Sequence, residues 1–526
     1  MATRSQTAAV LLAGALALAA CGSGGEQAPA AQGGGAGKTL VIDTSFDLKT
    51  ADPGRTYEPT GLIVGKATYE TLLTFDGSDV TKPVPALAES YELSDDGKVL
   101  TLKLKQGATF ADGSPITADD VVFSLTRVRD MKGTPSFLLD GVEIEKTDDT
   151  TITMTSEKAN AALPYILPNP ALGILNSDVV KENGGTADAQ DKAEQYLNAN
   201  SAGSGPYQIE SFNVSSQVVL KANPKYHGDK PAYEKVVIRN VESATQKLNV
   251  QRGDSQMALN LSGDQVTNMP DTLQVKKTAS ANVFFLLANQ DPGVSKVTTN
   301  AKFVEAVRKG VDYSGLLELA GEGSTRAPGV IPSQLLGALP AEEAVQRDVE
   351  GAKAALAESG LSNPTVKLEF PTELTVNGLS FQPLAERVQA NLKEVGITVD
   401  LQPAPVTTAL DNYRNGKEEM GLWYWGPDYP DPNDYLAFLP GQTVGERAGW
   451  KAGAAKELED LGAKAAAAIG DEARTEAYHE VQRKLNESGP FIPLIQPSQN
   501  IVAATSVTGV EYHPVWQVDV ADLGAQ

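Results

Sequence analysis

Alternating hydrophobic and polar positions predict strands in the first third of the chain. The alternation is clearest at residues 99–110, VLTLKLKQGATF, and it returns at 39–46 and 150–156. One helix separates these strands. Thr117 and Asp120 have the spacing of a capping box, and an apolar face follows at helical spacing: Val121, Val122, Leu125 and Val128. This region is therefore predicted to be mostly strand, with few helices.

From about residue 282 the pattern changes to strands that alternate with helices. Apolar runs predict buried strands at 283–289 and 420–425, and VKLEF at 366–370 predicts a further strand. Between 366–370 and a further strand at 397–403, an apolar stripe at helical spacing ends at a glycine: Leu384, Val388, Leu392, Val395 and Gly396. A strand, a helix and a strand of these lengths imply a right-handed parallel crossover. This half of the chain is therefore predicted to contain an α/β domain.

The strand at 420–425 runs directly into a proline-rich acidic loop, WGPDYPDPNDY, at residues 425–435. Its three prolines, at positions 427, 430 and 432, exclude a regular helix and remove three backbone donors from any sheet. In open α/β sheets, ligands bind beyond the carboxyl ends of the strands. The loop therefore lies where a ligand site is expected, and its stiffness would hold a binding group in place.

The loop places a carboxylate beside aromatic rings, a combination that suits a cationic ligand. Asp428 can accept charge-assisted hydrogen bonds from an ammonium group, while Trp423, Trp425 or Tyr429 supplies apolar or cation–π contact. Alternation along the strand puts Trp423 and Trp425 on one face and Tyr424 on the other. The alternative is that the tryptophans pack in the core, Trp423 more than Trp425, and that the aspartates only form turns.

Composition argues against several other functions. The net charge of −23, with no basic cluster, does not suit a nucleic-acid partner. The three histidines are far apart and there is one cysteine, so we expect no metal and no cofactor. The loop also lacks the spacing, the glycine and the closing glutamate of an EF-hand. We do not expect an enzyme, because there is no GxSxG motif and the pair Asp428 and Asp431 is more simply explained by turns.

The beginning of the chain has the pattern of an export and attachment segment. A short positive segment and an apolar run, too short to span a membrane, end in LAACG at 18–22, which resembles a bacterial lipobox. We therefore predict a signal peptide at 1–20, lipidation of Cys21 and a flexible tether over 21–37. QGGGAGKT at 32–39 is one residue short of a Walker A loop, but a strand pattern follows it where a helix should begin, so we reject nucleotide binding.

Several segments resemble, in order, the solute-binding lipoproteins of peptide/nickel-type ABC transporters, the bacterial extracellular solute-binding proteins of family 5. The longest is residues 85–128, PALAESYELSDDGKVLTLKLKQGATFADGSPITADDVVFSLTRV. The others are GSGPYQIESF (203–212), KANPKYHGDKPAYEKVVIR (221–239), FVEAVRKGVD (303–312), VQANLKEVGITVDL (388–401), WGPDYPDP (425–432) and FIPLIQPS (491–498). Together they span nearly the whole mature chain.

The resemblance implies an α/β, two-lobed periplasmic-binding-protein (Venus-flytrap) fold with an extra subdomain in the first lobe. The expected division is residues 38–76, 203–284 and 490–526 in lobe I, 77–202 in the extra subdomain, and 285–489 in lobe II. The chain would then cross between the lobes twice. We expect a monomer that encloses its ligand between the lobes.

The resemblance also implies the substrate-binding component of an ABC importer, attached through Cys21 to the extracytoplasmic face of the cell membrane and serving permease and ATPase subunits. In peptide-binding members the Asp of a W-x-x-D motif accepts the peptide's α-ammonium, which assigns that role to Asp428 and places Trp425 in the cleft. Asp431 is then structural. Dipeptide-type members carry an Arg for the ligand carboxylate in an earlier loop, but no Arg or Lys occurs from 368 to 386. We therefore expect oligopeptides as ligands. An oligosaccharide or other polar solute is the alternative, and a surface sensor or enzyme is a minor one.

Overall fold

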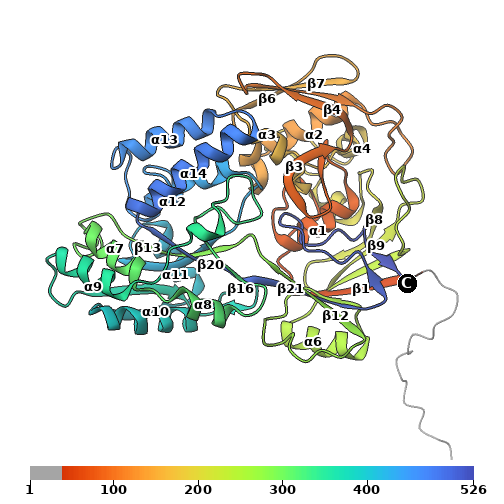
Figure 1. Cartoon of the computed structure of the whole chain (residues 1–526). Coiled ribbons are helices and arrows are strands. Elements are labelled where there is room, and N and C mark those ends of the chain that lie inside the picture. The colour runs from red at the N-terminus through yellow and green to blue at the C-terminus, as the bar shows by residue number, and fades with distance from the viewer. Residues whose placement is uncertain (1–37) are drawn as a thin grey trace, which may run out of the picture. The chain divides into compact units, whose positions relative to one another are not determined.

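The computed structural model describes residues 38–526, which form two large sheets, a smaller third sheet and the helices that cover them (Figure 1). The predicted signal peptide, the lipidation at Cys21 and the tether lie outside the described residues. Among the helices of residues 38–526, none has both the length and the apolar character needed to cross a membrane.

The first large sheet has seven strands in the order β12-β21-β11-β1-β10-β9-β8. They come from separate parts of the chain: β1 (Thr39–Thr44), β8 (Tyr207–Asn213), β9 (Gln217–Ala222), β10 (Lys235–Asn240), β11 (Met257–Ala258), β12 (Leu273–Ala279) and β21 (Ser498–Ala504). β1 is parallel to β10 and β11, and the other neighbours are antiparallel. Helices α1 (Pro59–Thr68) and α6 (Ser243–Arg252) bury apolar side chains against its two faces. We call this sheet with its helices the first lobe.

The second large sheet has six strands in the order β14-β20-β13-β19-β15-β18. Their bounds are β13 (Val283–Ala288), β14 (Thr325–Arg326), β15 (Thr365–Pro371), β18 (Thr398–Ala404), β19 (Met420–Trp425) and β20 (Phe491–Gln496). β15 and β18 are parallel and are joined through α10 (Phe381–Val395), so the predicted parallel crossover is confirmed. α10 ends at Gly396, which has a φ of 98° that a side chain would disfavour. We call this sheet with its helices the second lobe.

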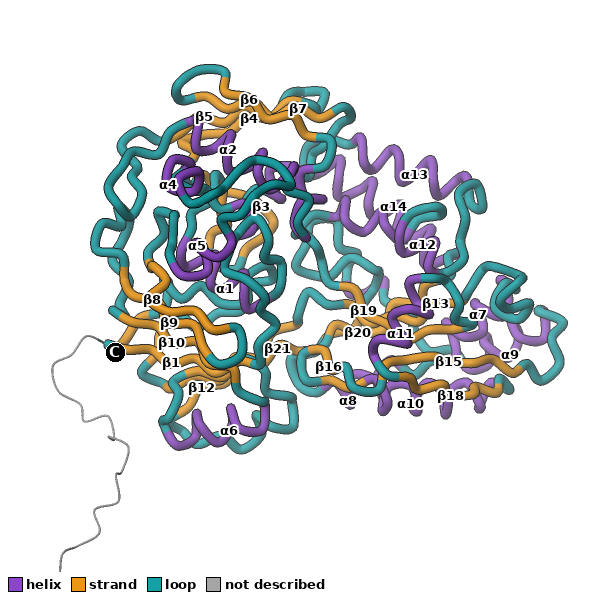
Figure 2. Tube along the Cα trace, turned by 180° about the vertical axis from the view of Figure 1, so that it is seen from behind, coloured by secondary structure: helices purple, strands orange, loops and turns teal. Residues whose placement is uncertain are grey.

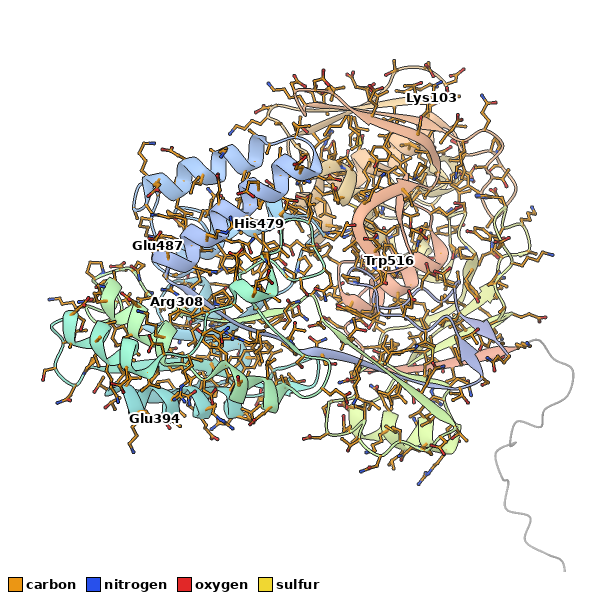
Figure 3. All side chains as sticks on the ribbon, in the orientation of Figure 1. Lys103, Arg308, Glu394, His479, Glu487 and Trp516 are labelled. Carbon is orange, nitrogen blue, oxygen red and sulfur yellow. The ribbon has the colours of Figure 1, made fainter. Side chains whose placement is uncertain are left out.

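Helices cover both faces of the six-stranded sheet because its strands are apolar on both sides (Figures 1 and 2). One face packs against α10 and α7 (Ala301–Gly310), α8 (Tyr313–Ala320) and α9 (Val349–Glu358). The other packs against α11 (Val406–Arg414), α12 (Thr443–Arg447), α13 (Lys456–Ala467) and α14 (Asp471–Ser488). The outer surface carries exposed charged side chains such as Glu394 and Glu487, whereas Trp516 lies in the interior (Figure 3).

The third sheet is antiparallel, in the order β4-β5-β7-β6, and packs against α2 (Ala118–Asp130). Its strands are β4 (Ala88–Leu93), β5 (Val99–Leu104), β6 (Val142–Lys146) and β7 (Thr151–Ser156). The predicted capping box of α2 is confirmed: the Thr117 side chain accepts from the Asp120 amide, and the Asp120 carboxylate accepts from the Thr117 amide. The remaining elements are β2 (Leu73–Asp76), β3 (Asp79–Pro85), α3 (Leu163–Ile166), α4 (Ser177–Glu182), α5 (Glu194–Ala199), β16 (Thr375–Val376), β17 (Leu379–Ser380), β22 (Val507–Thr508), β23 (Gly524–Ala525) and 3₁₀ helices at Thr134–Leu139, Pro170–Leu172, Ala341–Glu343 and Pro432–Phe438.

The chain passes between the two large sheets at two places, and the second corrects a predicted boundary. It enters the second lobe between β12 and β13 and returns between β20 and β21. A return at residue 490 is one strand too early, because Phe491–Gln496 (β20) pairs with β13 in the six-stranded sheet. All six of these residues are buried there, so an apolar strand that resembles the others of the second lobe completes it before the chain leaves.

Candidate functional site

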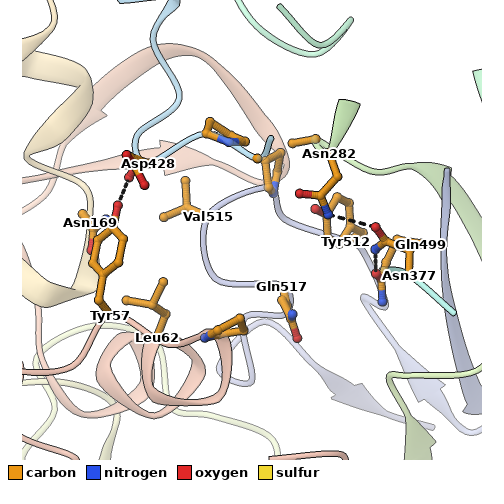
Figure 4. A pocket seen from close by; sticks show the side chains of 15 residues that line it. Tyr57, Leu62, Asn169, Asn282, Asn377, Asp428, Gln499, Tyr512, Val515 and Gln517 are labelled. Carbon is orange, nitrogen blue, oxygen red and sulfur yellow. Dashed lines mark hydrogen bonds between the residues drawn. The ribbon is translucent and has the colours of Figure 1, made fainter. Parts of the chain in front are cut away.

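The proline-rich loop leaves the end of β19 and meets the first lobe. β19 is parallel to β15, so the loop starts at the edge of the sheet where β15 also ends. Tyr57, which precedes α1 of the first lobe, donates its hydroxyl to the backbone carbonyl of Asp428 (Figure 4). The loop therefore lies at the boundary between the lobes, where a ligand could contact both.

Asp431 is bound inside the protein by an arginine. Both of its carboxylate oxygens lie 2.7 Å from Nη2 of Arg474, and both side chains are buried. Asp431 also accepts from the backbone amide of Asn433 at 2.9 Å and so caps the 3₁₀ helix Pro432–Phe438. All of these contacts are internal, which agrees with the structural role expected of this residue.

Asp434 fixes the conformation of the loop around Asp428. Its Oδ2 accepts from the backbone amide of Asp428 at 3.0 Å and from Nε1 of Trp425 at 3.2 Å. Burial, together with the negative charge of Asp428, raises the pKa of Asp434 well above its usual value. Through these two hydrogen bonds Asp434 holds the backbone of Asp428 and the indole of Trp425 in place.

The Asp428 carboxylate has no ion-pair or hydrogen-bond partner among residues 38–526, although its backbone is bound on both sides. It lines two cavities, one of about 180 Å³ and one of about 790 Å³. Burial raises the pKa of Asp428 to about 6, and the positive charge of Arg447 opposes this rise. A partly desolvated carboxylate of this kind is suited to bind a cation from outside the chain.

The smaller cavity is lined by amides on the side opposite Asp428 (Figure 4). Nδ2 of Asn282 donates to Oδ1 of Asn377 at 2.9 Å, and Nδ2 of Asn377 donates to Oε1 of Gln499, which belongs to the first lobe. Gln517 also lines this cavity. Asn377 and Gln517 have φ values of 53° and 60°, which are rare for residues with a side chain and are often found at functional sites. The same four amides line a further cavity of about 630 Å³ between the lobes.

Asn377 belongs to a tight hairpin within residues 368–386, the segment in which no Arg or Lys occurs. Asn377 and Gly378, with φ values of 53° and 78°, connect β16 to β17 as a two-residue turn. A Cβ on Gly378 would lie 2.6 Å from the Cα of Ser262 in the first lobe. This part of the second lobe therefore reaches the first lobe with its backbone and a neutral amide rather than with a cationic side chain.

A cationic side chain, that of Arg447, lines the larger cavity, and no pattern in the sequence indicated it. Trp425, Tyr429 and Asp428 line it together with Arg447 of α12. The guanidinium of Arg447 lies 4.9 Å from the ring centroid of Tyr413 and 5.6 Å from that of Trp425. No spacing or motif relates Arg447 to the loop, since it comes from a separate helix that only the fold brings to this cavity.

The predicted aromatic residues are placed differently from one another. Trp425 and Tyr429 line the larger cavity, whereas Trp423 is 2% exposed and lines neither cavity. Trp423 stacks on Tyr413 with centroids 4.5 Å apart and donates from Nε1 to Glu418 at 2.8 Å. The predicted alternation is confirmed, because Trp423 and Trp425 pack in one apolar cluster and Tyr424 in the other. Trp423 is thus a core residue, as the alternative interpretation has it.

No group of three or more His, Cys, Asp and Glu side chains within residues 38–526 is arranged to hold a metal ion.

Known proteins are similar to this chain in sequence and in fold over most of their length. A family model, "Bacterial extracellular solute-binding proteins, family 5 Middle", matches residues 82–446. A protein of Escherichia coli (strain K12) named probable D,D-dipeptide-binding periplasmic protein is 29% identical, over 90% of this chain and 92% of that protein. The dipeptide-binding protein of the same organism is 24% identical, over 86% of this chain and 88% of its own.

Solved structures agree in fold. The ABC transporter substrate-binding protein CtaP of Listeria monocytogenes aligns with a TM-score of 0.81 and 20% identity, over 93% of this chain and 99% of its own. A periplasmic binding protein of Helicobacter pylori, solved in complex with the peptide STSA, aligns with a TM-score of 0.73 and 22% identity, over 93% of this chain and 98% of its own. The predicted two-lobed periplasmic-binding-protein fold is confirmed.

Proposed function

This chain belongs to the bacterial extracellular solute-binding proteins of family 5, and on that premise we propose that it captures peptides by their α-ammonium group for an ABC importer. The observation that carries the proposal is Asp428, a largely buried carboxylate at the end of β19 with no partner among the described residues. A peptide ammonium has three donors and a full positive charge, and both properties match this carboxylate.

The surroundings of Asp428 suit a preorganised ammonium site. Its backbone amide is bound by Asp434 and its carbonyl by Tyr57, so the backbone that carries the carboxylate does not need to be ordered when ligand arrives. Trp425 and Tyr429, in the same cavity, offer ring faces to a cation or to an apolar side chain. Backbone hydrogen bonds to an extended peptide would add affinity that depends little on side-chain identity.

Two relatives and one structural neighbour support peptides as the ligand class. The E. coli relatives are named for a D,D-dipeptide and for dipeptides, and the H. pylori protein was solved with a four-residue peptide. On this proposal the chain works as a monomer, is held at the extracytoplasmic face of the membrane by lipid on Cys21, and passes its ligand to permease and ATPase subunits. Ligand would favour the closed arrangement of the lobes only by as much as it binds that arrangement better.

A second candidate ligand is an oligosaccharide or another polar, uncharged solute. The amide-lined cavity of about 630 Å³ favours it, because Asn and Gln side chains can both donate to and accept from hydroxyl groups. Asp428 would then accept from a hydroxyl, and Trp425 would provide a stacking face.

Isothermal titration calorimetry with alanine peptides of two to five residues tests the proposal. The tightest binder is compared with its N-acetylated form, which loses only the ammonium. We expect acetylation to weaken binding by about 100-fold, because it leaves Asp428 buried without a cation. Equal binding of the two forms would refute the role of Asp428. Failure of every peptide, with thermal stabilisation by oligosaccharides alone, would replace peptides with the second candidate.

A further inference from the structure

The proposed peptide site has a positive group as well as a negative one. Arg447 lines the cavity of about 790 Å³ that Asp428 also lines, and no carboxylate among residues 38–526 lies within 4.0 Å of its guanidinium. This differs from Arg127, Arg239 and Arg474, each of which forms an ion pair with a buried aspartate. Arg447 therefore forms no ion pair with an acid of residues 38–526, although its positive charge favours the ionised form of Asp428.

Aromatic rings hold the guanidinium of Arg447 in place. It lies over Tyr413 at 4.9 Å and near Trp425 at 5.6 Å, and Tyr413 in turn stacks on the buried Trp423. A guanidinium on a ring face keeps its N–H donors in its own plane, free to bind a carboxylate in a bidentate manner. The rings reduce the conformational freedom that a long arginine side chain would otherwise lose on binding.

Asp428 and Arg447 lie on the walls of one cavity, which Asp140, Glu157, Lys158 and Asp434 also line, and its volume suits a small peptide. Sites for compounds of drug size are typically about 300–1,000 Å³, and this cavity falls in that range. Few other cationic side chains near this cavity could bind the carboxylate of a ligand. The hairpin at Asn377 carries no cation and does not line this cavity, and Lys158, the other cation on the cavity wall, is exposed to solvent.

We propose that Arg447 binds the carboxylate of the ligand while Asp428 binds its ammonium, so that the preferred substrates are short peptides with both ends free. This inference rests on the proposed function, because it assumes that Asp428 binds the ammonium of a peptide. It makes Arg447 a specificity-determining residue, because it would select ligands that have a free carboxylate.

The test compares the tightest-binding alanine peptide with its C-terminal amide, both with a free amine, by calorimetry. We expect wild type to prefer the acid by about 10- to 100-fold, as for a charge-assisted bidentate contact. Arg447→Gln should reduce this preference to less than about threefold, while Arg447→Lys should keep part of it. Arg414→Gln, which removes an exposed cation that lines neither cavity, is the matched control and should behave as wild type.

The possible outcomes distinguish a failure of the Arg447 role from a failure of the proposed peptide-binding function. Loss of the preference in Lys158→Gln, or its retention in Arg447→Gln, would overturn the role of Arg447. If wild type binds acid and amide equally but does not bind the N-acetylated peptide, Arg447 has no such role and the function of Asp428 stands. If wild type binds none of the peptides, the proposed function itself fails. Thermal unfolding of Arg447→Gln should fall only slightly below that of wild type, because the substitution removes the contacts with the Tyr413 and Trp425 rings but no ion pair with residues 38–526.

Discussion

Asp428 and Asp431 belong to the same loop, three positions apart, yet their surroundings are opposite. Asp431 is fully buried, bonded through both oxygens to Arg474, and caps a 3₁₀ helix. Asp428 lies between two cavities, and no described side chain is bonded to its carboxylate. Its backbone, in contrast, is bound by Asp434 and Tyr57.

The difference indicates which acid is structural and which is available to a ligand. An acid with an internal counter-ion contributes to folding, since its removal leaves that counter-ion buried and unpaired. An acid with a fixed backbone and no counter-ion is costly to keep ionised, and a cationic ligand can recover that cost. Mutating the two residues should therefore affect different properties of the protein.

The largest expected effect is on folding, in Asp431→Asn. The substitution keeps the shape of the side chain but leaves Arg474 uncompensated in the interior, so we expect a loss of about 3–5 kcal/mol in the free energy of unfolding. Urea denaturation followed by tryptophan fluorescence measures it. Asp460→Asn, which breaks the exposed pair with Lys456, is the matched control and should cost less than about 1 kcal/mol. Equal stability of Asp431→Asn and wild type would contradict the structural role.

The next effect is on binding, in Asp428→Asn. We expect the affinity for a free-amine peptide to fall by about 100-fold, or about 2–3 kcal/mol, because a charge-assisted contact is lost. Stability should not fall, since the substitution removes a desolvated charge. Calorimetry and thermal unfolding measure the two quantities, and Asp411→Asn, from an exposed pair with Lys417, controls for net charge. If Asp428→Asn unfolded more readily but bound the peptide normally, Asp428 would be a structural residue and not the ligand-binding one.

A smaller effect is expected from pH. Only ionised Asp428 binds an ammonium, and its pKa in the ligand-free protein is about 6. The affinity should therefore fall by about tenfold between pH 7 and pH 5, while the peptide's own termini keep their charges. The contribution of Asp428 to the stability of the ligand-free protein should change with pH in the opposite direction. The pKa of Asp428 is higher in the folded than in the unfolded state, so its contribution to stability is greatest at low pH and is lost as pH rises through about 6.

Calorimetry at several pH values, with the same series for Asp428→Asn, isolates this residue from other titrating groups. The variant should show no loss of affinity between pH 7 and pH 5. A wild-type affinity that does not change over this range would mean that Asp428 either does not titrate there or does not contact the ligand.

Local patterns in the sequence predict the elements of this fold and the place of the loop. The alternation that separates Trp423 from Tyr424, the parallel crossover through α10 and the capping box at Thr117 all depend on residues close together in the chain. The structural role expected of Asp431 has the same origin, since an Asp before a proline commonly shapes a turn.

What could not be predicted depends on contacts between distant residues. Arg474 reaches Asp431 from α14, Arg447 reaches the cavity from α12, and Asn377 meets Gln499 across 122 positions. No periodicity relates these residues, because tertiary packing alone brings them together. β20 shows the same limit: its buried pattern predicts a strand but does not say which of the two sheets it joins.

The smallest expected effects come from the two tryptophans of β19, which repeat the comparison between a structural and an available residue. Trp423→Phe removes the donor to Glu418, a buried acid whose pKa is raised to about 9 by burial, so we expect a loss of about 1–2 kcal/mol in stability and unchanged affinity. Trp425→Phe keeps a ring in the cavity but removes the donor to Asp434, so we expect affinity to fall by about 0.5–1 kcal/mol, with less effect on stability. Urea denaturation and peptide calorimetry on both variants measure the contrast. If Trp423→Phe weakened binding more than Trp425→Phe, the core residue would be Trp425, and the site would have to include the other end of this strand.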